Sequence, residues 1–575
     1  MIITFISFIY IFMMSLIVGI MIRKALARVI PVPKVETIGI CGIVMTGLVT
    51  LTVYAEFFSI FYKVGALCHG VIFVLSIVGA FVYKNEILGV LRNAIISFDA
   101  IRWIIYVFLL IVACFYASRG QYHTDTGIYH AQAIRILEEY GCIKGLGNFQ
   151  LHFAYNSAYL ALCALFTMSF ILPVALHTMT GFFMLLLSIY AVEGLFSIRY
   201  HKQHGGDMAR IAILIYAFSN ITGLQSPATD YGTMYLVLYI LCMWLAYAEE
   251  KKNSDEDISF YGFLSVLSIF AVSMKLSAAA IVLLAVYPLV LLIREKKYKE
   301  IALFICVGFF TFLPFLIRNV IISGWLFYPV ENIDLFNVIW KIPVEYMRVD
   351  SAQIKVWGRC LYDINRLGDP ISVWLPVWWD GQQFYGKMLI CAQIMGLFFW
   401  ALLVACKTLR LFSGERIIKY DVVIFYVTVI ANILLWFLTA PFIRYGLAFL
   451  LLLPLCACGD VVSSIFKKGY VQAAMISAIV LFSFFSWFEN YIGDDIEFIQ
   501  NYGMDGYVLW PIPFEDAETD VCEMDGVTVY NSTDEEVNSY NYYPNTCYHD
   551  MMNRTELIGS TIKEGFKPKD VTDGD

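Results

Sequence analysis

Apolar runs of about 20 residues follow one another along most of the sequence. A run of this length lets an α-helix cross the roughly 30 Å hydrocarbon core of a bilayer. Only 15% of the 575 residues are charged, against about a quarter in ordinary soluble domains. No alternation of polar and apolar residues recurs at the spacing of barrel strands, so we expect helical spans. The sequence predicts an all-α polytopic membrane protein with about 13–14 transmembrane helices.

Lys and Arg predict which side of the membrane each connection faces, because short cytoplasmic loops carry an excess of both. The basic connections at 23–34 and 84–102 are expected inside, so the run at 103–118 leads outward. Later basic connections lie at 199–210, 249–257, 294–299, 407–419 and 467–468. All of them share the cytoplasmic side only if 151–198 crosses a net odd number of times. We therefore expect one of its two apolar runs to be re-entrant or interfacial, with both termini outside.

Polar interruptions divide the chain into six expected segments. They are N-terminal transmembrane helices (1–118), an external loop with an amphipathic helix (119–150), a central transmembrane bundle (151–317), a Trp-rich external loop (318–386), C-terminal transmembrane helices (387–489) and a small extracytoplasmic tail (490–575). The Trp-rich loop holds six of the 12 Trp residues. Its rings indicate either an interfacial aromatic belt or flat faces on which sugar rings stack. Cys522 and Cys547 lie in the polar tail, where an extracytoplasmic location favours a disulfide.

The external loop at 119–150 is the first long polar interruption and holds His123, Asp125, Tyr129 and His130. A carboxylate just past a span can orient and deprotonate an acceptor hydroxyl, or hold a divalent cation. Tyr129 follows Asp125 by four positions and shares its helix face. The two histidines could bind phosphate or tune the carboxylate. The alternatives are a helix N-cap for Asp125, interfacial histidines and a solvated connector.

A second carboxylate, Asp230, ends the segment Ser226–Asp230 at the outer end of a span. It is expected at the same membrane depth as Asp125. Two carboxylates on one side favour a metal or a shared-substrate site, with Mg²⁺ or Mn²⁺ as the candidate cofactor held by Asp125 and Asp230. A turn followed by a helix cap is the alternative. No Cys or His spacing typical of zinc occurs.

Three cations lie near the expected outer boundary: Lys275, Arg318 and Arg444. A charge at mid-membrane costs about 2.5–3.5 kcal/mol on insertion scales, so it usually has a function or reaches the interface. Lys275 has apolar runs on both sides. An outward-facing cation cluster suits the phosphate of a lipid-linked donor, with Arg as a bidentate clamp. For Arg318 and Arg444, interfacial anchoring is the alternative.

Several short motifs occur in order along the chain. They are Tyr122–His130 (YHTDTGIYH), Glu139–Gly141, Gly145–Asn148, Phe153–Ser157, Ser226–Asp230, Arg318–Asn319 with Gly324–Pro329, Thr439–Pro441 with Arg444–Tyr445, Cys547–Tyr548 and Gly565–Phe566. Together they resemble the GT-C superfamily of polytopic membrane glycosyltransferases. More narrowly, the sequence looks like a group of bacterial polytopic membrane proteins associated with surface-polysaccharide gene neighbourhoods.

The resemblance implies a helical bundle with an outward cavity and large external loops. It makes Asp125 the catalytic carboxylate, a polyprenyl-phosphate-linked sugar the donor, and a glycan, lipid or protein the acceptor. The site would face the outside of the bacterial plasma membrane. Two features depart from the family pattern. Phe442 and Ile443 stand where a more polar pair is expected, and extra N-terminal spans precede the catalytic loop.

The resulting hypothesis is an inverting sugar transfer in cell-surface polysaccharide biosynthesis. Asp125 is the expected base, Asp230 a second polar determinant, and Lys275, Arg318 and Arg444 the groups that neutralise the leaving phosphate. A polysaccharide polymerase or ligase that uses external Arg and His residues is one alternative. A non-enzymatic transporter of lipid-linked glycans is another, although its typical paired repeats and broken helices are not seen. No basic patch suggests a nucleic-acid partner.

Overall fold

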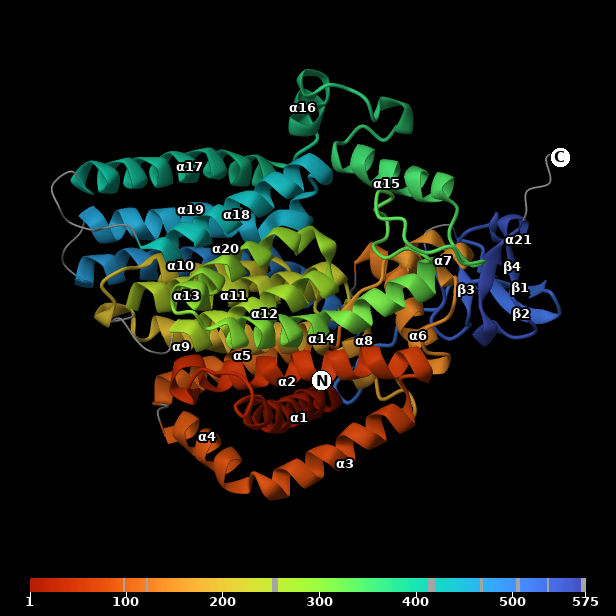
Figure 1. Ribbon diagram of the computed structural model, residues 1–575, viewed down its shortest axis with the longest axis horizontal. Coiled ribbons are helices and arrows are strands. Elements are labelled where there is room, and N and C mark those ends of the chain that lie inside the picture. Colours follow the sequence, from red (N-terminus) through yellow and green to blue (C-terminus); the bar gives the residue numbers. More distant parts are fainter. Residues whose placement is uncertain are drawn as a thin grey trace.

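The computed structural model describes residues 1–96, 99–119, 123–250, 257–411, 419–465, 469–502, 507–534 and 537–569. Tyr122 of the predicted catalytic loop lies outside the described residues, as do parts of three basic connections and the whole of the connection at 467–468. The structure is about 71% helical. Long helices lie alongside one another in one bundle, and the strands lie beyond one of its ends (Figure 1).

The helices of the first half follow the apolar runs. Their bounds are α1 (Ile2–Leu26), α2 (Val35–Phe61), α3 (Ala66–Val82), α4 (Lys84–Ile96), α5 (Ala100–Tyr116), η1 (Thr126–His130), α6 (Ala131–Glu139), α7 (Leu146–Phe149), η2 (Leu151–Ala154), α8 (Ala158–Phe166), α9 (Met179–Leu195), η3 (Ile198–Tyr200), α10 (Gly205–Ser219), η4 (Ile221–Gly223), α11 (Thr229–Glu250) and α12 (Asp257–Met274). Local capping sets some of these bounds. Asp99 accepts a hydrogen bond from the backbone N–H of Arg102 at the start of α5, and Ser157 does so from Tyr159 at the start of α8.

The second half continues the bundle and adds the strands. Its elements are η5 (Leu276–Ala285), α13 (Val286–Arg294), α14 (Tyr298–Ser323), α15 (Val344–Gly358), η6 (Ile364–Arg366), α16 (Ile371–Asp380), α17 (Phe384–Leu411), α18 (Tyr420–Thr439), α19 (Ile443–Ile465), α20 (Gly469–Tyr502), β1 (Thr519–Met524), β2 (Val527–Ser532), β3 (Asn545–Thr546), α21 (Met551–Arg554), β4 (Thr555–Leu557), η7 (Ile562–Glu564) and β5 (Phe566–Pro568).

The long apolar helices are those of a polytopic membrane protein. Within the described residues, nine helices are long and apolar enough to cross a membrane: α1, α2, α11, α12, η5 with α13, α14, α17, α18 and α19. The pair α3 and α4, bent by 81°, would make a tenth span. Shorter apolar helices are α5, α9 and the first part of α20. The expected total of about 13–14 spans stays a prediction.

Polar side chains gather at both ends of α11. Asp230 lies in its first turn. Near its last turn, Glu249 accepts hydrogen bonds from the backbone N–H groups of Gly205 and Gly206 at 3.0 and 2.8 Å. At 1.5 Å per helical residue, the two carboxylates are roughly 30 Å apart, which matches the thickness of a hydrocarbon core. We call the end of the bundle that holds Asp230 the site end.

The region 151–198 contains one long helix rather than two. Its first apolar run forms α8, which has only nine residues and is too short to cross a bilayer. The second run forms α9, which has 17 residues. The sequence predicted that one of these runs would not cross, and α8 is the run that stays short. Every residue of α8 is buried, so it lies within the protein rather than on its surface.

Two helices continue past expected segment boundaries. The Trp-rich loop was expected from 318, but α14 extends to Ser323. The tail was expected from 490, but α20 extends to Tyr502. The tail also contains strands, which the sequence analysis did not predict. β1, β2 and β3 form one sheet in that order, with β1 and β2 antiparallel, and β4 and β5 form a second, antiparallel sheet.

The predicted disulfide between Cys522 and Cys547 is absent, and both residues are thiols. Cys522 lies on β1 opposite Val529 of β2, whereas Cys547 directly follows β3 on the far side of β2. Two strand spacings of about 4.8 Å already separate their positions by more than the roughly 7 Å limit for bridging Cα atoms. The Cys547 sulfur instead accepts a hydrogen bond from the Gln150 side chain at 3.7 Å.

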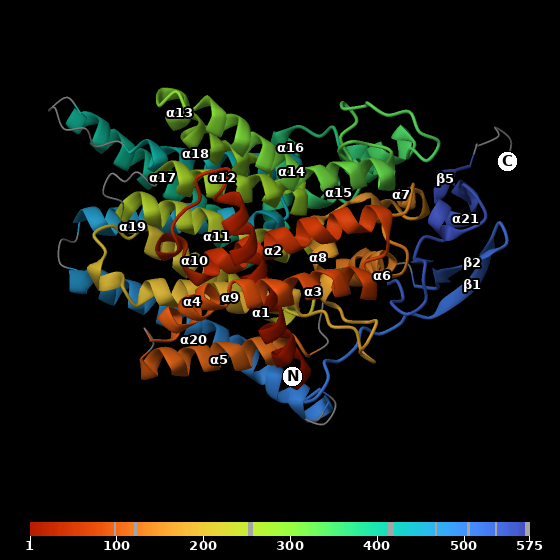
Figure 2. The ribbon, with the colours of Figure 1, turned by 60° about the horizontal axis from the view of Figure 1, so that its bottom comes forward.

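The tail packs on the external loop at the site end, and Figure 2 shows the strands there next to α6 and α7. The rings of Phe149 and Phe566 stack with their centroids 4.8 Å apart. The Phe566 backbone N–H donates to the Lys144 carbonyl at 2.9 Å. Asn538 donates from its backbone to the Gly127 carbonyl at 2.8 Å and from its side chain to the Ile128 carbonyl at 2.6 Å. The tail therefore holds η1 in place.

We predict that Gly145→Ala loosens the tail from the external loop. Gly145 has φ +61°, and an added Cβ would overlap the Phe566 carbonyl oxygen. The left-handed backbone alone costs an L-residue about 1–2 kcal/mol. Limited proteolysis in detergent should cleave the tail of this variant faster than that of the wild type. Gly526→Ala is the control, because Gly526 has φ +82° with open space around it. Equal cleavage of the two variants would contradict the role of this contact.

Candidate functional site

Asp125 stands directly before η1, a single π-helical turn that leads into α6. Such turns are rare and occur often at functional sites. Asp125 occupies the N-cap position of η1, as the alternative proposed, but its side chain makes no capping hydrogen bond. Its Oδ2 lies 2.9 Å from Nη2 of Arg444. The Asp125 backbone N–H donates to Nδ1 of His123 at 3.1 Å, and this ring nitrogen lies 3.7 Å from the carboxylate.

Arg444 connects several groups of the site. It lies at the start of α19, after the break that follows α18. Its Nη1 contacts the His123 ring, and its Nη2 donates to the Tyr445 hydroxyl at 3.1 Å. The guanidinium also lies 4.9 Å from the centroid of the Tyr445 ring. One cation thus contacts an anion, an imidazole and an aromatic ring that come from two distant parts of the chain.

A second ion pair joins Lys275 to Asp230. Lys275 occupies the break between α12 and η5, and its ammonium group donates to the Asp230 carboxylate. The same ammonium lies 4.2 Å from the centroid of the Tyr445 ring, so Tyr445 contacts both cations. The hydroxyls of Thr126 and Ser226 are 2.6 Å apart. This contact joins the segment of Asp125 to the segment of Asp230, and the two ion pairs form one group that we call the charge cluster.

The cations of the charge cluster favour the ionised form of Asp125, and burial favours the neutral forms of His123 and His130. Burial would raise the pKa of Asp125, but the positive charges around it, Arg444 foremost, hold this pKa below its ordinary value. Burial lowers the pKa of His123. Burial also lowers the pKa of His130 to about 3. His130 is 1% exposed, and neither of its ring nitrogens has a hydrogen-bond partner among the described residues.

The structure brings together seven of the eight predicted binding and catalytic residues: His123, Asp125, Tyr129, His130, Asp230, Lys275 and Arg444. The Tyr129 ring lies between two imidazoles, with centroids 4.1 Å from His130 and 5.3 Å from His152. Arg318 does not join them. Its Nη1 donates to Oε1 of Glu56 at 3.2 Å, and both residues are buried. The charge of Arg318 is therefore already balanced.

Sequence reasoning missed Tyr445, His152 and Glu56. A signal existed for Glu56, because it is a carboxylate in the middle of the long apolar helix α2 and such residues usually have a partner or a function. Tyr445 directly follows a predicted site residue in the sequence. Nothing in the sequence distinguished His152, which reaches the site because η2 turns the chain back toward Tyr129.

The charge cluster does not fit the predicted Mg²⁺ or Mn²⁺ site. Asp125 and Asp230, the predicted ligands, are each paired with a cationic side chain, so a metal ion would have to displace Arg444 and Lys275. Hard divalent ions need several oxygen ligands. Within the described residues, no three His, Cys, Asp or Glu side chains gather in a way that could hold a metal.

Three of the six Trp residues of the Trp-rich loop pack inside the protein. Trp325, Trp374 and Trp378 are buried. The indole N–H of Trp325 donates to the Ile342 carbonyl, and that of Trp378 to the Pro441 carbonyl, both at 3.0 Å. Trp357 and Trp379 are exposed, as expected of interfacial residues. Packing accounts for the three buried rings, and for the exposed rings both the aromatic belt and the sugar-stacking face stay predictions.

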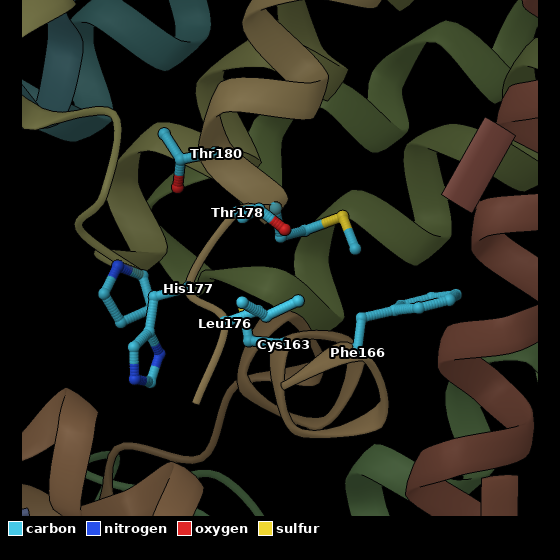
Figure 3. A pocket seen from close by; sticks show the side chains of 8 residues that line it. Cys163, Phe166, Leu176, His177, Thr178 and Thr180 are labelled. Atoms are coloured by element: carbon cyan, nitrogen blue, oxygen red, sulfur yellow. The ribbon is translucent and has the colours of Figure 1, made fainter. Parts of the chain in front are cut away.

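A small pocket lies between α8 and the start of α9, and one of its lining residues contacts the Ser226 segment of the site. Figure 3 shows its lining, which includes His177 and Thr180. The Thr180 hydroxyl donates to the Ser226 carbonyl at 2.6 Å and lies 2.7 Å from the Tyr159 hydroxyl. His177 stacks on Phe514, with centroids 4.0 Å apart. These polar groups hold the Ser226 segment and the tail, so we place no ligand site in this pocket.

We predict that Arg444→Gln destabilises the protein at neutral pH and that acid removes the difference. Without the guanidinium, burial raises the pKa of Asp125. Above this raised pKa the carboxylate is charged and buried without its partner, which destabilises the folded protein. Because the Arg444 side chain is 32% exposed, we expect a loss of about 1–2 kcal/mol at pH 7, less than the 3–5 kcal/mol of fully buried pairs. Unfolding of the purified protein in detergent between pH 4 and 8 measures the difference.

The sign of this pH dependence follows from the two pKa directions. In the wild type, the pKa of Asp125 is lowered. Its contribution to folding stability is therefore complete above the pKa of the unfolded chain, about 3.9, and is lost only as the pH falls below that value. In the variant, protonation as the pH falls relieves the buried charge. Asp125→Asn in the Arg444→Gln background should restore most of the lost stability at pH 7. A deficit that is independent of pH, with no rescue by Asp125→Asn, would contradict the ion pair.

Comparison with known proteins yields a family but no described function. No curated protein matches the sequence. No solved structure matches it either. The family described as a domain of unknown function, DUF8201, matches residues 1–451. This range includes the whole charge cluster, from His123 to Tyr445, and it ends before the tail strands. Since the match covers well over half of the sequence, the chain belongs to the DUF8201 family.

Proposed function

We propose that this protein is a GT-C-type membrane glycosyltransferase. It moves a sugar from a polyprenyl-phosphate-linked donor to a glycan, lipid or protein acceptor on the outer face of the bacterial plasma membrane, in cell-surface polysaccharide biosynthesis. The observation that carries the proposal is the charge cluster. Two carboxylates and two cations, contributed by four separate segments, meet at one end of an apolar helical bundle. Acid–base chemistry and phosphate binding are both available there.

The reaction assigns one role to each ion-pair partner. The acceptor oxygen attacks the anomeric carbon of the donor sugar, and its proton passes to the Asp125 carboxylate. The bond between the anomeric carbon and the phosphate oxygen breaks, and the phosphate leaves with the electron pair. Arg444 and Lys275 stabilise the charge that develops on this leaving group. Attack opposite the leaving group inverts the anomeric configuration.

The resting ion pairs would make donor binding a requirement for base activity. With Arg444 beside it, Asp125 has a lowered pKa and is a weak base. A donor phosphate attracts Arg444 and Lys275 more strongly than a carboxylate does, because it offers more charge and more acceptor oxygens. As Arg444 turns toward the phosphate, burial raises the pKa of Asp125 and makes it a better proton acceptor. The carboxylate then gains basicity only when the leaving group is in place.

The chain would cross the membrane about 13–14 times, of which nine or ten crossings have a candidate helix among the described residues, with α8 held inside the protein. The site end would face outward by the bias of basic residues toward cytoplasmic loops. The N-terminal amine donates to the Tyr507 carbonyl at 2.7 Å, and Ile512 donates from its backbone to the Ser118 carbonyl at 3.0 Å. The N-terminal end of α1 and residues 507–512 of the tail therefore lie together at the site end.

One contact favours an alternative function, that of a polysaccharide polymerase or ligase. Arg444 contacts His123 directly, and an Arg–His pair is the set of groups that this reading requires. A transporter has no such support. The two enzymatic readings differ in whether Asp125 or the Arg–His pair is essential, so substitution separates them.

We predict that Asp125→Asn lowers transfer by about 1,000-fold or more, because the amide cannot accept the proton. The assay follows release of polyprenyl phosphate from a panel of polyprenyl-phosphate hexoses and pentoses, with envelope lipids and glycans as acceptors. Asp363→Asn, an exposed carboxylate in another loop, is the control and should retain full activity. Unchanged transfer by Asp125→Asn would exclude the site. Loss with Arg444→Ala but not with Asp125→Asn would favour the ligase reading.

We also predict that the site end is extracytoplasmic. Thr124 and Lys202 are both exposed, one beside Asp125 and the other near the start of α10 at the opposite end. In a background whose reactive native thiols are replaced by Ser, a membrane-impermeant maleimide should label Thr124→Cys in intact cells and Lys202→Cys only after lysis. The reverse pattern would place the charge cluster in the cytosol and exclude the proposed reaction.

A further inference from the structure

Tyr445 contacts both cations of the charge cluster, but the proposed reaction gives it no role. Its hydroxyl oxygen accepts a hydrogen bond from Nη2 of Arg444 at 3.1 Å. The ammonium group of Lys275 lies over its ring, 4.2 Å from the centroid. Arg444 lies at the start of α19, whereas Lys275 occupies the break between α12 and η5. Two cations from distant parts of the chain therefore contact one neutral side chain.

These two contacts attract the cations without neutralising them. Arg444 and Lys275 repel each other, because both are positively charged. The face of an aromatic ring carries partial negative charge and attracts an ammonium group, and a phenol oxygen accepts hydrogen bonds. A carboxylate at position 445 would attract both cations more strongly, but it would also cancel the positive charge that binds a phosphate. A tyrosine leaves that charge available to a ligand.

The break between α18 and α19 fixes the position of Tyr445. Its backbone N–H donates to the Phe442 carbonyl at 3.0 Å, and the rings of these two residues pack with their centroids 5.1 Å apart. The indole N–H of Trp436, on α18, donates to the same carbonyl. The indole N–H of Trp378, on α16, donates to the Pro441 carbonyl at 3.0 Å. The start of α19, and with it the Tyr445 ring, is therefore anchored on two sides.

We propose that Tyr445 is a positioning residue that holds Arg444 and Lys275 where a single phosphate group can contact both. This role rests on the proposed function, in which the phosphate is the leaving group. A phosphate diester such as the sugar donor carries a single negative charge, whereas a phosphate monoester such as the released polyprenyl phosphate carries about two at pH 8. The two cations, and Tyr445 through them, therefore act most strongly on the charge that develops as the bond to the sugar breaks.

The test measures how three ligands of different charge bind to the full-length protein in nanodiscs at pH 8. Farnesyl phosphate is the phosphate monoester, farnesyl methyl phosphate the diester, and farnesol the neutral member. Tyr445→Phe keeps the ring and should weaken farnesyl phosphate about fivefold, because Arg444 loses a hydrogen-bond acceptor. Tyr445→Leu also removes the ring from Lys275 and should weaken it about 30-fold. The diester should lose less affinity in both variants, and farnesol none.

Matched controls come from another tyrosine that contacts a cation. Tyr346 is partly buried on α15, and the Arg554 guanidinium lies 5.7 Å from its ring centroid. Tyr346→Phe and Tyr346→Leu remove the same atoms outside the charge cluster and should bind all three ligands as the wild type does. Wild-type affinity for farnesyl phosphate in both Tyr445 variants would overturn the positioning role. An equal loss for all three ligands, or no binding of farnesyl phosphate to the wild type, would also overturn it.

Transfer kinetics separate this role from the proposed function. Tyr445→Phe should lower kcat about fivefold and change the donor KM by less than about twofold, because the lost support acts on charge that develops in the transition state. If binding depends on ligand charge and on Tyr445 as expected but the wild type transfers no sugar, the proposed function fails and the positioning role stands. If the wild type transfers sugar and both Tyr445 variants keep its kcat, the proposed function stands and the positioning role is wrong.

Discussion

The pairing of Asp125 with Arg444 is the contact on which the arrangement of the site depends. It joins the first external loop to the start of α19, and the neighbouring contact between His123 and Arg444 spans 321 positions of sequence. Removing two charges from water is costly unless the remaining hydrogen-bonding groups find partners. Arg444 meets this condition in part: its two Nη atoms contact His123 and the Tyr445 hydroxyl, whereas its buried Nε has no partner among the described residues.

Support for the pair comes from parts of the chain that carry no charge in the site. Thr126 and Ser226 connect the two carboxylate-bearing segments. Thr180 donates a hydrogen bond to the Ser226 carbonyl and is itself in contact with the Tyr159 hydroxyl. From the opposite direction, the tail fixes η1 through Asn538. Loops tolerate motion unless packing and hydrogen bonds over-determine them. The external loop is therefore held by the Ser226 segment on one side and by the tail on the other.

The sequence predicted the types and rough locations of the important groups better than it predicted their partners. Asp125, Asp230, Lys275 and Arg444 could be found because charges next to apolar runs are rare. Arg318 was assigned to the same site, because a sequence does not show that Glu56 balances it. The short strands of the tail, two to six residues each, are too brief to give a periodic signal. The disulfide was inferred from compartment alone, and β2 separates its two cysteines.

The dependence of η1 on the tail has a consequence for biosynthesis. The loop that carries Asp125 leaves the ribosome hundreds of residues before Asn538 and Phe566 are made. At roughly 5–20 residues per second, tens of seconds separate the two events. During that interval the charged groups of the loop lack the surface that orders them. In a nascent chain the external loop therefore gains its contacts with the tail only after residues 538–566 have been translated.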